Sequence, residues 1–283
     1  MILGPKDYKN ILINYSSSLN QLRDWGINIP ETSRLVKYQD TFESITEGSV
    51  PSDFETLVQI SFIIKEIDEI TKIVNSIEQN PNSATIDKLN HLKKDTLIQH
   101  QNNTNIEARN TQFELYLRYQ IINSGMKCSI GNPDLKVSFD EYEIEIEAKR
   151  PNHNGLDFNL RKGLKQLSPE KPGILVFSLD HLLFRDNDFI LLDNDEMEEN
   201  GMDFLQQKVD EWSYKNRPSI LRRASAKKSA IGMMFHARVP ILKKNNLNFI
   251  TIGSFKKMVP FYHPETPSYI KTKTFFDNFK LKI

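Results

Sequence analysis

The chain has 283 residues, of which 39% are hydrophobic and 26% are charged, a composition that excludes a wholly disordered or fibrous protein. Lys and Arg together number 37, as do Asp and Glu, so the molecule has no net charge with which to attract a polyanion from a distance. Any binding of nucleic acid would therefore use local basic surfaces.

The cysteine content and the apolar runs indicate the compartment. The single cysteine, Cys128, excludes an intrachain disulfide and a zinc site built from several thiolates, and favours a reducing compartment. No apolar run approaches the roughly 20 residues that a membrane-spanning helix needs, and the N-terminus lacks the pattern of a signal peptide. We therefore predict a cytoplasmic protein that makes no contact with a membrane.

The first hundred residues have a helical pattern, with apolar side chains at spacings of three and four. Ser52 and Glu55 form a capping box that predicts a helix over residues 53–77, and a second, mostly polar helix is expected over 84–98. The Gln/Asn-rich stretch at 99–103 then marks a domain boundary. We predict an α-helical recognition or assembly domain at 1–103 and an α/β domain at 104–283.

The second domain begins with a helix expected over residues 106–124, which Gly125 ends. Alternating segments then predict a strand, a hairpin, a helix at 156–167 and a buried strand at 173–179. Together they indicate an α/β fold with a mixed sheet flanked by helices. The expected early strands are Lys127–Ile130, Leu135–Phe139 and Tyr142–Lys149, and the late ones are 230–237 and 248–254.

The segment Tyr142–Lys149 alternates regularly between apolar and charged residues. Glu145, Glu147 and Lys149 share one face of the predicted strand, and a hairpin brings Asp134 alongside Glu147. Glu145 lies one pleat further in, which favours a structural or water-linked role for it. The spacing therefore predicts a charged site at the end of this strand.

Asn132-Pro133-Asp134, twelve further residues and then Glu147-Ala148-Lys149 resemble the signature of the PD-(D/E)XK nuclease superfamily, which has the restriction-endonuclease-like fold. The resemblance covers about residues 107–179. It implies a metal-dependent nuclease, foremost a DNA endonuclease of restriction, repair or defence against foreign DNA. It also implies that Glu114 on the preceding helix and Gln166 after the lysine strand belong to the site.

The implied chemistry explains these residue types. Phosphodiester hydrolysis needs an activated water and neutralisation of the anionic phosphate, which divalent ions held by carboxylates provide. Asp134 and Glu147 would be ligands of Mg²⁺, for which Mn²⁺ is a substitute, and the carbonyl of Ala148 would join them. Lys149 would hold the attacking water or stabilise charge on the phosphate. Glu114 would orient a ligand water or a second metal.

Each of these assignments has a plainer alternative. Glu147 and Lys149 could form a cross-strand ion pair on a solvated face, and Asp134 could shape a turn after Pro133. Acidic residues on amphipathic helices usually face solvent, and Glu107 is a rival of Glu114 for the same role.

Two basic clusters are candidates for nucleic-acid contact. The helix at 156–167 has a cationic face that suits phosphate tracking, although a merely solvated face explains it as well. A second cluster follows near residues 217–228, while the run at 186–203 has eight Asp or Glu and would repel a nearby phosphate backbone. The residues chosen are Arg161, Lys162, Lys165, Gln166, Arg222 and Arg223.

A function of a different class competes with the nuclease. The chain could be a catalytically silent scaffold or interaction module of the same fold, in which the N-terminal helices bind a second copy or an accessory protein. RNA is an alternative substrate to DNA, because metal-assisted phosphodiester chemistry does not select the sugar. The joint presence of Asp134, Glu147 and Lys149 favours the enzyme.

Overall fold

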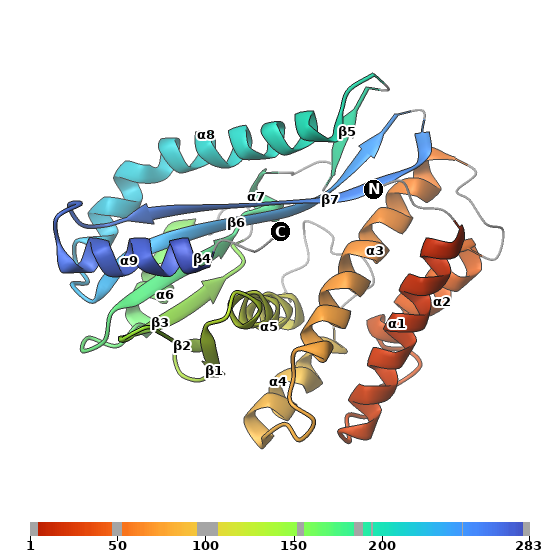
Figure 1. The fold of residues 1–283 in the computed structure, drawn as a ribbon, viewed down its shortest axis with the longest axis horizontal. Coiled ribbons are helices and arrows are strands. Elements are labelled where there is room, and N and C mark those ends of the chain that lie inside the picture. The colour runs from red at the N-terminus through yellow and green to blue at the C-terminus, as the bar shows by residue number, and fades with distance from the viewer. Residues whose placement is uncertain are drawn as a thin grey trace. The chain divides into compact units, whose positions relative to one another are not determined.

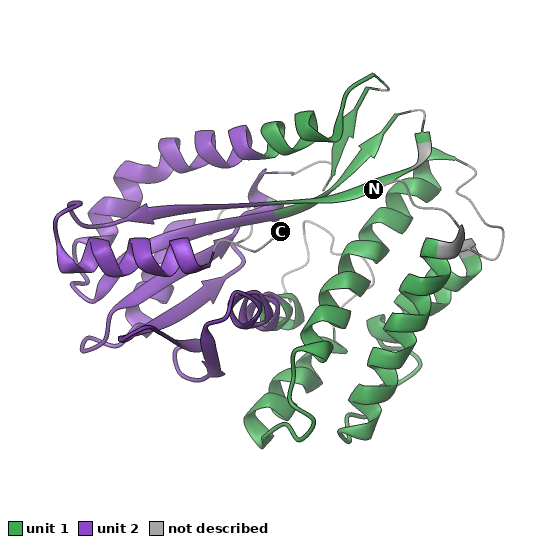
Figure 2. Ribbon diagram, in the orientation of Figure 1, with its two compact units in different colours: residues 1–112, 186–205, 238–254 green, residues 113–185, 206–237, 255–283 purple. Residues whose placement is uncertain are grey.

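The computed structural model describes residues 5–46, 53–94, 107–151, 156–183, 189–193, 195–244 and 246–279. The chain forms two compact units, each assembled from three segments (Figure 2). Unit 1 comprises Met1–Gln112, Asp186–Leu205 and Arg238–Ser254, and unit 2 comprises Phe113–Arg185, Gln206–Ala237 and Phe255–Ile283. The predicted boundary at 103–104 lies outside the described residues.

Helices form the first segment of unit 1: α1 (Pro5–Asp24), α2 (Arg34–Thr46), α3 (Phe54–Asn75) and α4 (Ser83–Leu92). The predicted start of α3 is wrong by one residue. Its N-cap is Asp53, whose carboxylate accepts from the backbone N–H of Thr56 at 2.8 Å, whereas Ser52 lies outside the described residues. The predicted end of α4 at residue 98 is also wrong, since the helix ends at Leu92.

Helices α1, α2 and α3 bury apolar side chains against one another, among them Leu19, Phe42 and Ile60, each 0% exposed. Tyr15, equally buried in α1, donates from its hydroxyl to the carbonyl of Leu35 in α2 at 2.9 Å. Its polar atom is therefore satisfied inside the apolar core.

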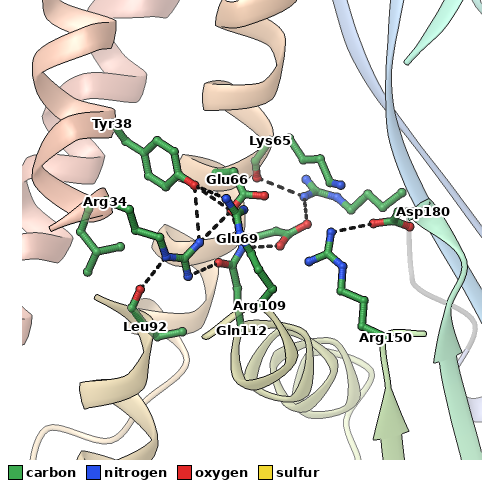
Figure 3. Close-up of polar contacts among 12 residues, drawn as sticks. Arg34, Tyr38, Lys65, Glu66, Glu69, Leu92, Arg109, Gln112, Arg150 and Asp180 are labelled. Atoms are coloured by element: carbon green, nitrogen blue, oxygen red, sulfur yellow. Dashed lines mark hydrogen bonds and ion pairs between the residues drawn. The ribbon is translucent and has the colours of Figure 1, made fainter. Parts of the chain in front are cut away.

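A network of charged and polar side chains lies buried among these helices (Figure 3). Arg34 of α2 donates to the carbonyl of Leu92 and to Oε1 of Gln112, both at 2.7 Å, and pairs with Glu66 of α3 at 3.2 Å. Arg109 also pairs with Glu66. Since the Arg34 side chain is 0% exposed, these partners replace the water that its guanidinium gives up on folding.

The same network joins the third segment of unit 1 to its helices. Gln112 donates to Glu69 at 2.6 Å, and Glu69 accepts from Arg238 at 2.7 Å (Figure 3). Arg238 also pairs with Asp68. Side chains from distant parts of the sequence thus specify how the segments of unit 1 pack.

The sheet is mixed, with the strand order β1-β2-β3-β4-β6-β5, and β7 pairs with β6 (Figure 1). Strands β1, β2 and β3 are antiparallel neighbours, whereas β3, β4, β6 and β5 pair in parallel. This arrangement confirms the predicted α/β class. The strands are β1 (Lys127–Ile130), β2 (Leu135–Phe139), β3 (Tyr142–Lys149), β4 (Gly173–Ser178), β5 (Ile190–Leu192), β6 (Ala230–Lys243) and β7 (Asn246–Pro260).

Within unit 2, helices cover both faces of the sheet. Helix α5 (Glu107–Asn123) packs its apolar side chains with those of Ile146 and Ala148, and α9 (Pro267–Asn278) adds Phe275 to this core. Gly125, at a φ of +89°, supplies the predicted end of α5.

The other face carries α6 (Leu156–Gln166) and the part of α8 (Glu198–Ala224) that belongs to unit 2. A Cβ on Gly163 of α6 would lie 3.0 Å from the side chain of Leu175 in β4. Trp212 of α8 meets Phe235 of β6 edge-on at 5.2 Å. Leu175 and Phe235 share this face because Leu175 pairs with Met233, two residues before Phe235.

The sequence did not predict several elements. β5, the short α7 (Asp180–Leu183), α8 and α9 were not expected, and β6 and β7 are longer than predicted. In the described part of the chain, no helix is both long and apolar enough to cross a membrane.

Candidate active site

Strand β3 separates the charged side chains of the predicted site from the core. Ile144, Ile146 and Ala148 point into the cluster beneath α5, so Glu145, Glu147 and Lys149 point to the face covered by α6. Helix α6 approaches closely at Gly163, whose missing Cβ would lie 3.7 Å from Cγ of Glu147. That distance is an ordinary van der Waals contact, so α6 lies directly over the Glu147 side chain and covers it.

Asp134 lies directly before β2 and reaches across to β3. Leu135 pairs with Ile146, so the same register continued by one residue places Asp134 opposite Glu147. Oδ2 of Asp134 accepts from the backbone N–H of Ala148 at 2.9 Å, and its carbonyl accepts from Gly131 N–H at 3.1 Å. Two hydrogen bonds therefore fix the residue beside Glu147, as the hairpin pattern predicted.

Glu147 and Lys149 form a buried ion pair through Oε1 and Nζ. The Glu147 side chain is 0% exposed and that of Lys149 is 13% exposed. Oε2 of Glu147 has no hydrogen-bond partner among the described residues. The plainer expectation of a solvated cross-strand pair is therefore wrong, since the carboxylate lies in the interior with one oxygen unsatisfied.

The pKa of Glu147 is raised from 4.5 to about 7. Burial is the largest cause because it disfavours the charged form, and the negative charge of Asp134 adds to it. The ammonium group of Lys149 and its hydrogen bond oppose the rise, and a backbone hydrogen bond from Asp134 opposes it less strongly. Such a displacement, caused by burial next to specific charged groups, is typical of functional sites.

The structure does not gather Glu114 with these two carboxylates. Helix α5 covers the face of the sheet opposite to that of Glu147, and the described residues include no group of three or more His, Cys, Asp or Glu that could hold a metal ion. The rival Glu107 lies in unit 1, 3.1 Å from His91. The role of Glu114 therefore stays a prediction.

The remaining donor set suits a hard divalent cation. Mg²⁺ is often held by one or two carboxylates and keeps several waters, so Asp134 and Glu147 suffice as side-chain ligands. The unpartnered Oε2 of Glu147 is an oxygen that such a cation would satisfy. Ala148 offers such a cation only its backbone carbonyl, since the residue is only 2% exposed and its side chain lies in the core.

The predicted nucleic-acid residues lie on α6 and on the unit 2 part of α8. Arg161 and Arg223 both contact Asp157, which accepts two hydrogen bonds from Arg223 at 2.8 and 3.1 Å and lies 3.2 Å from Arg161. This contact brings the two predicted basic clusters together. The exposed members are Arg161, Lys162, Lys165, Gln166 and Arg222, and Arg223 is half-buried.

Sequence reasoning missed other polar contacts near the site. Glu145, 4% exposed, accepts from the N–H of Ser168 just after α6 at 2.9 Å, which agrees with the structural role expected for it. Arg150 and Asp180, which follow β3 and β4, pair at 3.7 Å while both are buried (Figure 3). No local pattern signals these two contacts, because each joins residues from different elements.

Comparison of the chain with protein-family models, with curated proteins and with solved structures finds no match. The chemistry of the site is therefore argued from its own residues.

Proposed function

We propose that this chain is a metal-dependent nuclease with the restriction-endonuclease-like fold, acting on nucleic acid, foremost DNA, at Asp134, Glu147 and Lys149. One observation carries the proposal. A fully buried carboxylate lies beside a second carboxylate, with a lysine on one oxygen and no hydrogen-bond partner among the described residues on the other. A buried carboxylate oxygen without a partner is uncommon in native proteins, and a bound cation would explain it.

Asp134 and Glu147 would hold the metal, together with the backbone of Ala148. A bound Mg²⁺ or Mn²⁺ would supply a nucleophilic water at neutral pH and neutralise charge on the phosphate. The hydrogen bond from Ala148 N–H to Asp134 keeps that carboxylate oriented, so little rearrangement is needed on binding.

Lys149 has the role of the electrostatic group. Its Nζ contacts Glu147 in the substrate-free protein and is mostly buried, so its charge acts in a medium of low dielectric constant. On substrate binding the ammonium group would donate to a phosphate oxygen or to the attacking water, while Glu147 keeps it in place.

The surroundings of the site support the same function. The order of elements in unit 2, from α5 through the antiparallel β1–β3 to α6 and the parallel β4, is the order that the resemblance to the nuclease superfamily implies. The exposed cations of α6 and α8 lie on helices that cover the same face of the sheet as Glu147. They would provide phosphate contacts near the site.

One observation favours the competing function, a silent scaffold. The Glu147 side chain is 0% exposed and its charge is already paired with Lys149 without any bound metal or phosphate. In a scaffold this pair would only hold β3 and its surroundings together. The scaffold requires no metal and no phosphate. Cleavage and metal binding therefore separate the two functions.

The deciding experiment is cleavage of supercoiled plasmid, circular single-stranded DNA and RNA by the full chain with Mg²⁺, Mn²⁺ or EDTA. We expect metal-dependent cleavage by the parent protein and a loss of at least a hundredfold in Glu147→Gln and Lys149→Ala, the size found when one electrostatic group of an active site is removed. Lys171→Ala is the matched control. Lys171 forms an ion pair with Glu143, which lies on the same strand as Glu147, but this pair is exposed.

Folded protein that binds no Mn²⁺ and cuts none of the three substrates would contradict the nuclease. Equal cleavage by the parent and Lys149→Ala would place the chemistry elsewhere in the chain.

A further inference from the structure

Helix α6 carries an exposed aromatic side chain on its basic face. Phe158 is 61% exposed, and Arg161, Lys162 and Lys165 follow it at spacings of three, four and seven residues, all exposed. Residues at these spacings lie on one side of a helix. The buried side is equally regular, with Leu160, Gly163, Leu164 and Leu167. A large apolar ring is thus held in solvent next to three cations.

Helix α8 repeats this combination. Tyr214 is 81% exposed and opens the stretch 214–229, which has six Lys or Arg and no Asp or Glu. Arg217, three residues after Tyr214, is exposed beside it on the helix, and Arg222 is exposed further along the same helix. In the described part of unit 2, the exposed large apolar side chains are Phe158, Tyr214 and Ile270, so both exposed aromatic rings lie on basic stretches of helix, in α6 and in the C-terminal part of α8.

The two helices belong to one surface. Asp157, the neighbour of Phe158, holds Arg223 of α8 through two hydrogen bonds and also contacts Arg161. Both helices pack on the face of the sheet that carries Glu147, through Gly163 in α6 and Trp212 in α8. We call the exposed sides of α6 and of residues 214–224 the α6–α8 surface.

We propose that the α6–α8 surface binds single-stranded nucleic acid, with phosphates on its arginines and lysines and bases stacked on Phe158 and Tyr214. Its density of positive charge complements a phosphate backbone. The rings select the form of the ligand, because bases in a duplex are stacked on one another, whereas those of a single strand offer free faces. The inference deepens the proposed nuclease function and rests on it for the site that the bound strand would reach.

The test measures binding without catalysis. Fluorescence anisotropy of labelled oligo-dT, oligo-rU and a mixed-sequence duplex is followed with the full chain in EDTA. Stacking of one base is expected to contribute about tenfold in affinity. We expect Phe158→Leu and Tyr214→Leu each to weaken single-strand binding by about tenfold and duplex binding by less than about twofold. The dT and rU arms distinguish DNA from RNA.

Two variants separate stacking from charge and from general surface effects. Lys162→Ala is expected to weaken single strand and duplex alike and to reduce the slope of log affinity against log salt by about 0.7 for the single strand. Ile270→Ala removes an exposed apolar side chain from α9 and should leave all affinities unchanged. As a direct readout, photocrosslinking of 5-iodouracil oligonucleotides should attach to the peptides that contain Phe158 and Tyr214.

The outcomes also separate this inference from the nuclease. Single-strand binding that depends on Phe158 and Tyr214, without any cleavage by the parent protein, would support the α6–α8 surface as a binding site and contradict the proposed nuclease function. Cleavage by the parent protein, together with an unchanged single-strand affinity in Phe158→Leu and Tyr214→Leu, would contradict binding at the α6–α8 surface and support the nuclease. Failure to bind any single strand, or tighter binding of the duplex, would also overturn the inference.

Discussion

Replacing Glu147 by Gln should stabilise the protein at high pH and leave it unchanged at low pH. The carboxyl ionises near pH 4.5 when unfolded and near 7 when folded. Between these values the folded state keeps a proton that the unfolded state has lost, so the free energy of unfolding falls as the pH rises. The group's contribution is complete below pH 4.5 and is lost as the pH passes 7.

The size of the effect follows from the pKa. A rise from 4.5 to about 7, at about 1.4 kcal/mol for each pKa unit, corresponds to about 3 kcal/mol. Glutamine has the shape of the protonated acid and keeps an acceptor for Lys149, but it does not ionise. The variant should therefore exceed the parent by about 3 kcal/mol at pH 8 and by almost nothing at pH 4.

Urea unfolding of both proteins in EDTA, from pH 4 to 8, measures this difference. Trp212 contacts Phe235 and reports on unit 2, so Trp25→Phe is made in both backgrounds to leave one fluorophore. Glu143→Gln is the matched control: Glu143 is exposed, and its hydrogen bond with Lys171 lowers its pKa, so removing its charge gives no gain at pH 8. A Glu147→Gln difference that stays flat with pH would refute the reasoning.

Three further predictions concern the metal, the buried network and the thiol. Mn²⁺ at about a hundred times its dissociation constant should stabilise the parent by about 2.7 kcal/mol in thermal unfolding, and Asp134→Asn should lose this gain while remaining folded. Arg34→Met should lower the free energy of unfolding by about 3–5 kcal/mol, because it leaves Glu66 buried with less compensation, whereas Arg23→Met at an exposed site should change it by under about 0.5 kcal/mol. A smaller loss in Arg34→Met would mean that the other partners of Glu66 suffice. Burial raises the pKa of Cys128 from 9.0 to about 12, so a disulfide reagent at pH 8 should label the native protein about a thousandfold more slowly than the urea-unfolded chain, and equal rates would contradict this.

The early strands of the sheet could be predicted because local patterns determine them. The strand-like segments before Tyr142, the short polar turn at 140–141 and the alternation along Tyr142–Lys149 predicted β1, β2 and β3 with the bounds that the structure has. β6 is buried along almost its whole length and does not alternate, so its extent was underestimated. β5 has three residues within an acidic run, and α8 starts with glutamates and contains Pro218, which hid both from pattern reasoning.

The candidate site, like the sheet, was predictable only where local patterns determine it. The spacing from Asp134 to Glu147 is local information about a hairpin, and the structure brings these two residues together with Lys149. The complete burial of Glu147 depends on the packing of a later helix, α6, over its side chain, and the pair of Arg150 with Asp180 depends on the parallel pairing of β3 with β4. Such contacts follow from tertiary packing, which no single stretch of sequence encodes.

The three-segment build of unit 1 limits how this protein can be divided or recombined. Arg238, from the last of these segments, pairs with Asp68 and Glu69 near the other end of the chain, so the helices at the N-terminus share their buried ions with a strand encoded far downstream. A gene fragment that ends after α4 would encode these carboxylates without their arginine. The helical region is therefore unsuited to exchange as a cassette, because a foreign helical region would leave Arg238 of β6 without its carboxylates unless it supplied them at the same places.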